Sequence, residues 1–254
     1  MYHDIAPRAR REDVGFPGPL AARYKLEPEA FEAHLRALAG NEAQVGMLDR
    51  GILTAAEEPE VVISFDDGGA SASQAAEALE RRNWRGQFFV TTARIGTPGF
   101  LSRAEVRALA ERGHVVGSHS HTHPTYMGRM TRSELDWEWR TSRTILGDIL
   151  GAAPHTASVP GGYLSKEVVA AAASAGYDLL FTSEPTPRVR RGAITVRGRY
   201  TIWASTPAHV AAGYARGDHA ACTRLWLEWN AKKLAKRVSP RVYQALRGVR
   251  AGKA

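Results

Sequence analysis

Two short polar motifs, each following an apolar segment, carry side chains that can do chemistry. Residues 65–69 hold adjacent carboxylates, Asp66 and Asp67, directly after the apolar run 61–65. Residues 119–123 hold three imidazoles shortly after a second apolar pair. Carboxylates and imidazoles together suit zinc and similar divalent metals, and a carboxylate left off the metal can serve as a base. The two motifs therefore indicate a metal-assisted hydrolase.

Each motif also has a simpler explanation. Asp-Asp-Gly alone is typical of a solvated turn, and clustered histidines alone are typical of a surface tract or an incidental metal binder. Both motifs, however, follow predicted strands in a chain that alternates strands with helices. Active sites of α/β barrels lie at the carboxyl ends of their strands, so the coincidence favours a functional site.

The elements that must position these residues alternate along the chain. Capping boxes at Ser102–Glu105 and Thr131–Glu134 mark the starts of two helices. Such repeated strand–helix units predict an α/β fold with a largely parallel sheet, closed or nearly so. The predicted strands are 61–65, 87–90, 114–117 and 179–181, and the predicted helices are 28–38, 71–82, 102–113, 131–150 and 165–176.

Both motifs resemble those of a known family. Ser64-Phe65-Asp66-Asp67-Gly68 is similar to the first motif of the NodB-homology polysaccharide deacetylases, carbohydrate esterase family 4, and His119-Ser120-x-x-His123 to the second. The resemblance implies a distorted (β/α) barrel and hydrolytic removal of an acyl group from an amino sugar. It also implies that Asp66 is the catalytic base and that Asp67, His119 and His123 bind the metal.

The spacing of the histidines sets a condition on the loop that carries them. His119 and His123 are four residues apart, so we expect a helical turn after the strand to bring them to one face, with Pro124 ending that turn. His121 would then point elsewhere, and we expect it to orient a neighbour or line the pocket.

Residues 159–163 occupy the place of the family's third motif. The resemblance implies that a backbone N–H near Gly161 helps hold the oxyanion and that Pro160, Gly162 and Tyr163 contact substrate. A plain Pro-Gly-Gly turn is the alternative. Ser158 stands where the family has the arginine that steadies the catalytic aspartate, so how Asp66 is held is an open question.

A general acid is harder to locate. His209 and His219 lie in predicted helical segments, away from any strand end. Tyr2-His3-Asp4 resembles the Tyr-His near the start of the family's permuted branch, which implies that His3 protonates the leaving amine. The alternative is a histidine on a frayed terminus, because Met1 leaves almost no strand before it.

Composition and charge limit the kinds of site and partner that the chain can have. The 254 residues, 44% apolar, suffice for a sizeable core, and the single Cys222 excludes a cysteine-rich zinc site and an internal disulfide framework.

We expect a deacetylase domain at 1–205 and a basic helical extension at 206–254. The net charge of +8 owes much to this extension, and it has three explanations: a solvated face, contact with an anionic substrate or membrane, and nucleic-acid binding. No nucleic-acid motif accompanies it, so we expect no nucleic-acid partner.

These inferences converge on one expected activity. We expect a metal-dependent enzyme that removes an N-acetyl group from an amino sugar or glycan precursor, with Zn²⁺ as cofactor and Co²⁺, Ni²⁺ or Mn²⁺ as alternatives. An O-acetyl esterase, an N-deformylase of a lipid-linked sugar and a carbohydrate-binding protein with a decayed site stay open. No membrane-spanning run and no signal peptide are seen, so we expect a cytoplasmic enzyme with peripheral membrane contact through its C-terminal helices.

Overall fold

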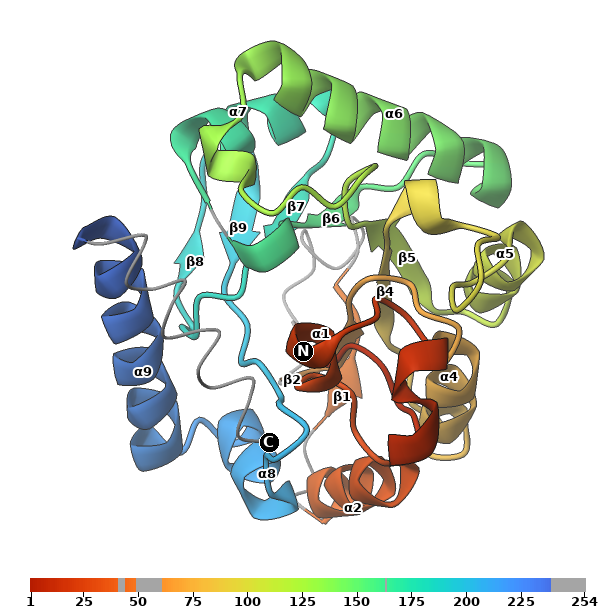
Figure 1. The fold of residues 1–254 in the computed structure, drawn as a ribbon, viewed down its shortest axis with the longest axis vertical. Coiled ribbons are helices and arrows are strands. Elements are labelled where there is room, and N and C mark those ends of the chain that lie inside the picture. The colour runs from red at the N-terminus through yellow and green to blue at the C-terminus, as the bar shows by residue number, and fades with distance from the viewer. Residues whose placement is uncertain (41–43, 49–60, 163, 239–254) are drawn as a thin grey trace.

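Strand and helix units alternate along the chain and roll the strands into a curled sheet, as the computed structural model shows (Figure 1). The structure describes residues 1–40, 44–48, 61–162 and 164–238, and for 232–238 the backbone alone. Neighbouring strands of the main sheet run parallel, except that β8 is antiparallel to β9. In spatial order the strands are β3 (Ser64–Phe65), β4 (Gln87–Val90), β5 (Val115–Ser118), β6 (Thr156–Ser158), β7 (Leu179–Phe181), β9 (Thr195–Arg197) and β8 (Val189–Arg190). The fold is the expected distorted α/β barrel.

Helices cover the outside of the curled sheet, and each of four follows a strand. They are α4 (Ala72–Glu80), α5 (Arg103–Glu111), α6 (Arg132–Leu150) and α7 (Lys166–Ala175). Both predicted capping boxes are confirmed: Ser102 accepts from the N–H of Glu105, and Thr131 accepts from the N–H of Glu134. Because the strands are parallel, their carboxyl ends gather at one rim, where the loops that enter these helices begin.

The N-terminal residues connect the edge strand β3 to the segment that follows β9. Tyr2 forms a parallel bridge with Phe65, its N–H donating to Ser64 O at 2.7 Å. On the other side, the N–H of Ile202 donates to Met1 O at 2.9 Å. Residues 1–2 therefore lie between β3 and the segment that follows β9, which brings these distant parts of the chain together.

The predicted strand 61–65 is divided between two sheets. Val61 and Val62 form β2, which pairs in parallel with β1 (Val45–Gly46), whereas Ser64 and Phe65 belong to the main sheet. The remaining short elements are η1 (Arg8–Asp13), α1 (Pro19–Ala22), η2 (Thr92–Arg94), η3 (Met127–Arg129) and η4 (Pro160–Gly162).

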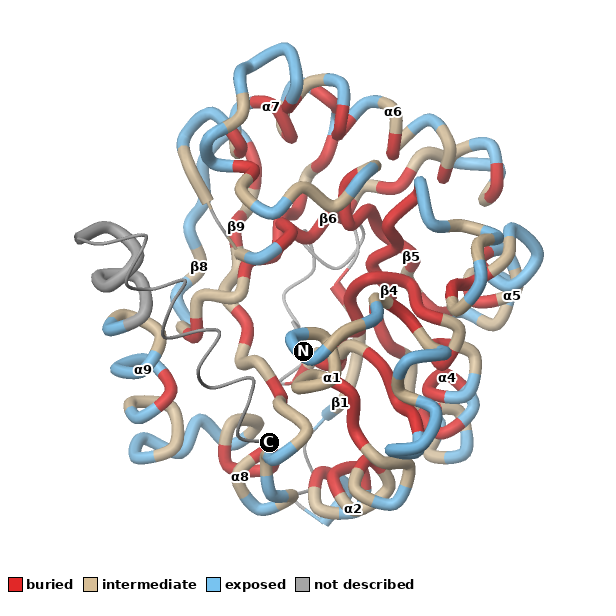
Figure 2. The backbone as a smooth tube through the Cα atoms, in the orientation of Figure 1, coloured by how far each residue is buried: buried red, intermediate tan, exposed pale blue. Residues whose placement is uncertain are grey.

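The core lies between the sheet and its helices, and the central strands are buried along their length (Figure 2). Helix α2 (Pro28–Ala39) directs Phe31 and Leu35 into this core, and α8 (Ala208–Ala215) packs beside α2 and adds Ala211 to the same cluster. Helix α9 (His219–Val238) follows α8. Within the described residues, no helix has the length and apolar character needed to cross a bilayer.

Candidate active site

Strand ends at the rim bring one carboxylate and two imidazoles together. Asp67 follows β3, His119 follows β5, and His123 lies in the loop after β5. One ligand atom from each lies within 4.8 Å of the others. Nε2 of His119 and Nε2 of His123 are each 3.4 Å from Oδ1 of Asp67.

Two observations fit this group to a metal ion. Oδ1 of Asp67 is buried and makes no hydrogen bond in the described part of the chain, so it has an unsatisfied acceptor directed at the two imidazoles. Nδ1 of His119 lies 3.0 Å from the carbonyl of Ser158 and donates to it, so in the neutral ring the lone pair is on Nε2. A carboxylate with two neutral imidazoles is a donor set for zinc and similar ions.

The loop that carries His123 takes a different path from the expected one. No helical turn follows β5; instead, Ser120 and His123 both have φ of 62°. The loop is held by Glu138 of α6, a buried carboxylate that accepts from the N–H of His121, the N–H of Thr122 and the hydroxyl of Thr122. The expectation of a helical turn is therefore wrong, because left-handed residues and a buried carboxylate bring the two imidazoles together.

His121 is outside the metal-binding group, as expected. Its Nδ1 lies 2.9 Å from the hydroxyl of Thr92, and its ring packs edge-on against Trp137. It therefore joins this loop to its neighbours on two sides.

The second carboxylate, Asp66, has a cationic partner that the sequence motifs did not identify. Arg199 donates from Nη1 to Oδ1 of Asp66 and from Nη2 to Oδ2, both at 2.7 Å. The other Arg199 N–H groups donate to Ser64 Oγ, Ser158 Oγ and Thr182 O, so all five donors have acceptors. The guanidinium also lies over the rings of Phe89 and Phe181.

This ion pair explains how Asp66 is held although Ser158 stands where the family has an arginine. The hydroxyl of Ser158 donates to Asp66 at 3.2 Å and accepts from Arg199, so the short side chain at this position leaves room for a guanidinium from the segment after β9. The only sequence signal was the missing arginine itself, with five arginines between 188 and 199 as candidates. Nothing in their spacing singled out Arg199.

The charges of the site follow from these contacts. Burial opposes ionisation of Asp66, but the charge and hydrogen bonds of Arg199 outweigh it and hold the pKa of Asp66 well below its usual range. Burial likewise opposes ionisation of Asp67, and the surrounding imidazoles outweigh it, so its pKa falls to about 2. Burial lowers the pKa of His123 to about 4, which keeps its ring neutral at physiological pH.

His3 lies beside the two aspartates. Tyr2 pairs with Phe65, and the N–H of Asp66 donates to Tyr2 O at 3.0 Å, so the next residues in register are His3 and Asp66. Paired residues of parallel strands direct their side chains to the same face of the sheet. Burial lowers the pKa of His3 and outweighs the opposing charges of Asp67 and Asp66.

The third predicted motif forms the short helix η4 after β6. Gly161 and Gly162 have φ of 61° and 68°, and a Cβ on Gly162 would lie 1.8 Å from Ser183 Oγ, so glycine is required there. The N–H of Gly162 donates to Val159 O, and Pro160 is buried. Tyr163 lies outside the described residues.

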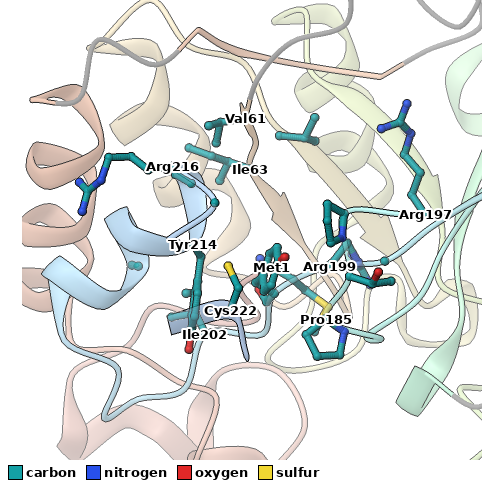
Figure 3. A pocket seen from close by; sticks show the side chains of 18 of the residues that line it. Met1, Val61, Ile63, Pro185, Arg197, Arg199, Ile202, Tyr214, Arg216 and Cys222 are labelled. Carbon is teal, nitrogen blue, oxygen red and sulfur yellow. Dashed lines mark hydrogen bonds between the residues drawn. The ribbon is translucent and has the colours of Figure 1, made fainter. Parts of the chain in front are cut away.

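A separate cavity shares Arg199 with this site (Figure 3). Its volume is about 720 Å³, and neither the two aspartates nor the histidines of the metal-binding group line it. Val61, Ile63, Ile202 and Tyr214 give it a largely apolar wall. This cavity is therefore distinct from the group formed by Asp67, His119 and His123.

Comparison with known proteins identifies a family model and related sequences that match this chain. A sequence model of the polysaccharide deacetylase family matches residues 54–180, half of the chain. The peptidoglycan-N-acetylglucosamine deacetylase PgdA of Listeria monocytogenes is 29% identical over 157 residues, which cover 61% of this chain and 31% of PgdA. The Bacillus subtilis protein YxkH is 26% identical over 167 residues, 63% of this chain and 60% of YxkH. The chain thus spans less than two thirds of either relative.

A solved structure supports the fold. The polysaccharide deacetylase BC0361 from Bacillus cereus superposes with a TM-score of 0.69 over 85% of this chain and 67% of that protein, at 21% sequence identity. The overall fold described above is therefore shared with that solved structure.

Proposed function

Because this chain belongs to the polysaccharide deacetylase family, we propose that it is a metal-dependent hydrolase that removes an N-acetyl group from an amino sugar of a glycan or glycan precursor. The observation that carries the proposal is the contrast between two adjacent carboxylates. Asp67 faces two imidazoles with an unsatisfied oxygen, whereas both oxygens of Asp66 accept hydrogen bonds from Arg199. One carboxylate is thus available to a metal, and its neighbour is kept ionised as a base.

The metal would be held by Asp67, His119 and His123. A divalent ion bound there would polarise the substrate carbonyl and lower the pKa of water. Zn²⁺ fits the donor set best, with Co²⁺, Ni²⁺ or Mn²⁺ as alternatives.

Asp66 would accept the proton from water as the water oxygen attacks the amide carbonyl carbon. Its carboxylate must be ionised and correctly directed for this step. Arg199 and Ser158 meet both requirements by fixing its two oxygens.

His3 would donate a proton to the amide nitrogen as the carbon–nitrogen bond breaks, so that water and the N-acetyl sugar yield acetate and a free amine. The register of Tyr2 with Phe65 supports this role by placing His3 beside Asp66. The N–H of Gly161 is the proposed donor to the oxyanion. Pro160, Gly162 and Tyr163 are the proposed substrate contacts around it.

The sugar is proposed from the relative PgdA, whose name gives N-acetylglucosamine in peptidoglycan as its substrate. The first assay would therefore measure acetate release from penta-N-acetylchitopentaose and from peptidoglycan by zinc-loaded protein. Asp66→Asn serves as the matched variant because it keeps the size of the side chain. We expect acetate release by the wild type, loss of about 10²–10⁴-fold in Asp66→Asn, and equal zinc content in both.

The same assay identifies other outcomes. Acetate from O-acetylated but not N-acetylated glycan would indicate an esterase, and formate from N-formyl sugars would indicate a deformylase. Glycan binding with no product from any of these substrates would contradict the hydrolase proposal and favour a binding protein.

A cytoplasmic location with peripheral contact to anionic membrane is also proposed. The membrane contact is supported by Trp226 and Leu227, which are 45% and 56% exposed on α9. Co-sedimentation with phosphatidylglycerol vesicles, compared with phosphatidylcholine vesicles, would test the membrane contact; equal pelleting with both, or with neither, would contradict it.

A further inference from the structure

The ring of His3 lacks the polar partner that usually orients a catalytic imidazole. In Ser-His-Asp sites, a buried carboxylate accepts from one ring nitrogen and fixes the orientation of the other. Here Nδ1 of His3 is buried and has no hydrogen-bond partner in the described part of the chain. Some other contact must limit rotation of this ring.

Packing against an aromatic ring supplies that contact. The ring of His3 packs against Tyr24 with centroids 4.5 Å apart and 41° between the planes. Tyr24 stacks on Trp203, also at 4.5 Å, with 26° between the planes. The guanidinium of Arg23 lies 5.3 Å from the centroid of the Trp203 ring. Three aromatic rings and one cation thus form a continuous column that begins at the active site.

The backbone segments that carry this column are tied to one another. The N–H of Leu26 donates to Asp4 O at 3.0 Å, which joins the Tyr24 segment to the His3 segment. The N–H of Ala204 donates to Arg23 O at 2.8 Å, which joins the Tyr24 segment to the Trp203 loop.

A buried histidine, His34, connects the segment that carries His3 to the loop that carries Trp203. His34 of α2 lies 3.2 Å from the hydroxyl of Tyr2 through Nδ1 and 2.8 Å from Thr206 O through Nε2. Thr206 in turn accepts through Oγ1 from the N–H of Trp203. The residue before His3 and the loop that carries Trp203 are therefore held at a fixed separation.

We propose that Tyr24, supported by Trp203, is the positioning residue for His3 and takes the place of the orienting carboxylate. This inference rests on the proposed function, in which His3 protonates the leaving amine. It goes further by stating that packing against an aromatic ring, and no acidic partner, sets the direction of the proton donor.

The test uses two substrates that differ in their need for an acid. An N-acetylated oligosaccharide has an amine leaving group that must be protonated, whereas 4-nitrophenyl acetate has a leaving group that needs no proton. Zinc-loaded wild type, His3→Ala, Tyr24→Leu, Tyr24→Phe and the double variant His3→Ala/Tyr24→Leu are compared on both. Trp203→Leu and Trp203→Phe repeat the comparison one ring further out, and zinc content and thermal unfolding are measured for each.

We expect Tyr24→Leu to lose at least about tenfold in kcat/KM on the amide and less than about threefold on the ester. Tyr24→Phe keeps the ring and should stay within about twofold of the wild type on both substrates. In the His3→Ala background, Tyr24→Leu should cause no further loss on the amide, because both changes remove the same contribution. Equal losses on amide and ester, additive losses in the double variant, or a Tyr24→Phe defect as large as that of Tyr24→Leu would overturn the proposal.

A second readout does not depend on activity. The ring current of Tyr24 should shift the ring-proton resonances of His3 in NMR spectra of zinc-loaded protein. Tyr24→Leu should remove this shift and Tyr24→Phe should keep it; an unchanged resonance in Tyr24→Leu would overturn the proposal. If the wild type hydrolyses no N-acetyl substrate, the proposed function fails while this measurement still decides whether Tyr24 orients His3.

Discussion

Arg199, which follows β9, and Asp66, which follows β3, form a two-point ion pair with both nitrogen–oxygen distances at 2.7 Å. The residues are 133 positions apart in sequence, and both are buried. A buried carboxylate without a partner would be protonated or would destabilise the fold. The pair therefore sets both the charge and the direction of the proposed base.

Arg199→Lys should show whether Asp66 needs only a positive charge or also the two parallel hydrogen bonds of a guanidinium. A lysine keeps the positive charge but cannot make two parallel hydrogen bonds to a carboxylate. We expect kcat on the N-acetyl substrate to fall by about 10- to 100-fold, with zinc content unchanged. Arg199→Met should in addition lower the free energy of unfolding by about 3–5 kcal/mol, because it leaves Asp66 buried and unpaired.

Arg190→Lys provides the matched control, since Arg190 lies on the adjacent strand β8 and pairs with the half-exposed Glu184. It should keep wild-type activity. The exchange Ser158→Arg/Arg199→Ser should recover part of the activity lost in Arg199→Ser, because it returns a guanidinium to Asp66 from β6. Full activity in Arg199→Lys would contradict the positioning role.

Removing one ligand should remove the metal. His119→Ala and Asp67→Ala each delete a donor from the three-residue group, and we expect zinc content to fall from near one per chain to below about 0.1 after dialysis. Inductively coupled plasma mass spectrometry measures this directly. His121→Ala, from the same loop but outside the group, should keep its zinc, and stoichiometric zinc in His119→Ala would refute the ligand set.

The strand-end residues were predictable because their signal is local. Asp66, Asp67 and His119 follow apolar strands directly, and parallel strands bring such ends to one rim. The same holds for the two capped helices, whose first four residues contain the whole signal.

The path of the loop that carries His123 and the Arg199–Asp66 ion pair both depend on contacts between residues that are distant in sequence. Ser120 and His123 adopt positive φ without being glycine, stabilised by Glu138 from a helix that begins nine residues later. Arg199 reaches Asp66 only because residues 1–2 and the segment after β9 lie beside β3. These are consequences of barrel closure, which no local pattern of the chain encodes.

Glu138→Gln should weaken both the loop and the metal site. The carboxylate of Glu138 accepts three hydrogen bonds from residues 121 and 122, and an amide has one oxygen to offer in place of two. We expect the free energy of unfolding to fall by about 2–3 kcal/mol. Zinc affinity should fall by about 10- to 100-fold, because the direction of His123 depends on this loop.

Urea unfolding and zinc competition with a chelator measure the two effects of Glu138→Gln. Thr122→Val removes only one of the three donors to Glu138 and should give a smaller loss in both. Wild-type zinc affinity in a folded Glu138→Gln protein would show that the loop is held by other contacts.

The ionisation of Asp4 should make the free energy of unfolding depend on pH. Burial raises the pKa of Asp4 to about 7 from an unfolded value near 3.8, against the opposing hydrogen bond from Ser71. Between these values the native state binds more protons than the unfolded chain, so this contribution to the free energy of unfolding falls as pH rises and is constant above about pH 7.

Asp4→Asn is neutral at every pH and should remove that dependence. Relative to the wild type, it should gain stability progressively from pH 4 to 7, reaching on the order of 2–4 kcal/mol at pH 8. Urea denaturation of both proteins in the presence of a chelator, at half-unit intervals of pH, measures the difference without a contribution from metal binding. The exposed Asp13→Asn is the control and should run parallel to the wild type. A constant difference between Asp4→Asn and wild type from pH 4 to 8 would show that Asp4 is ionised in the native state throughout.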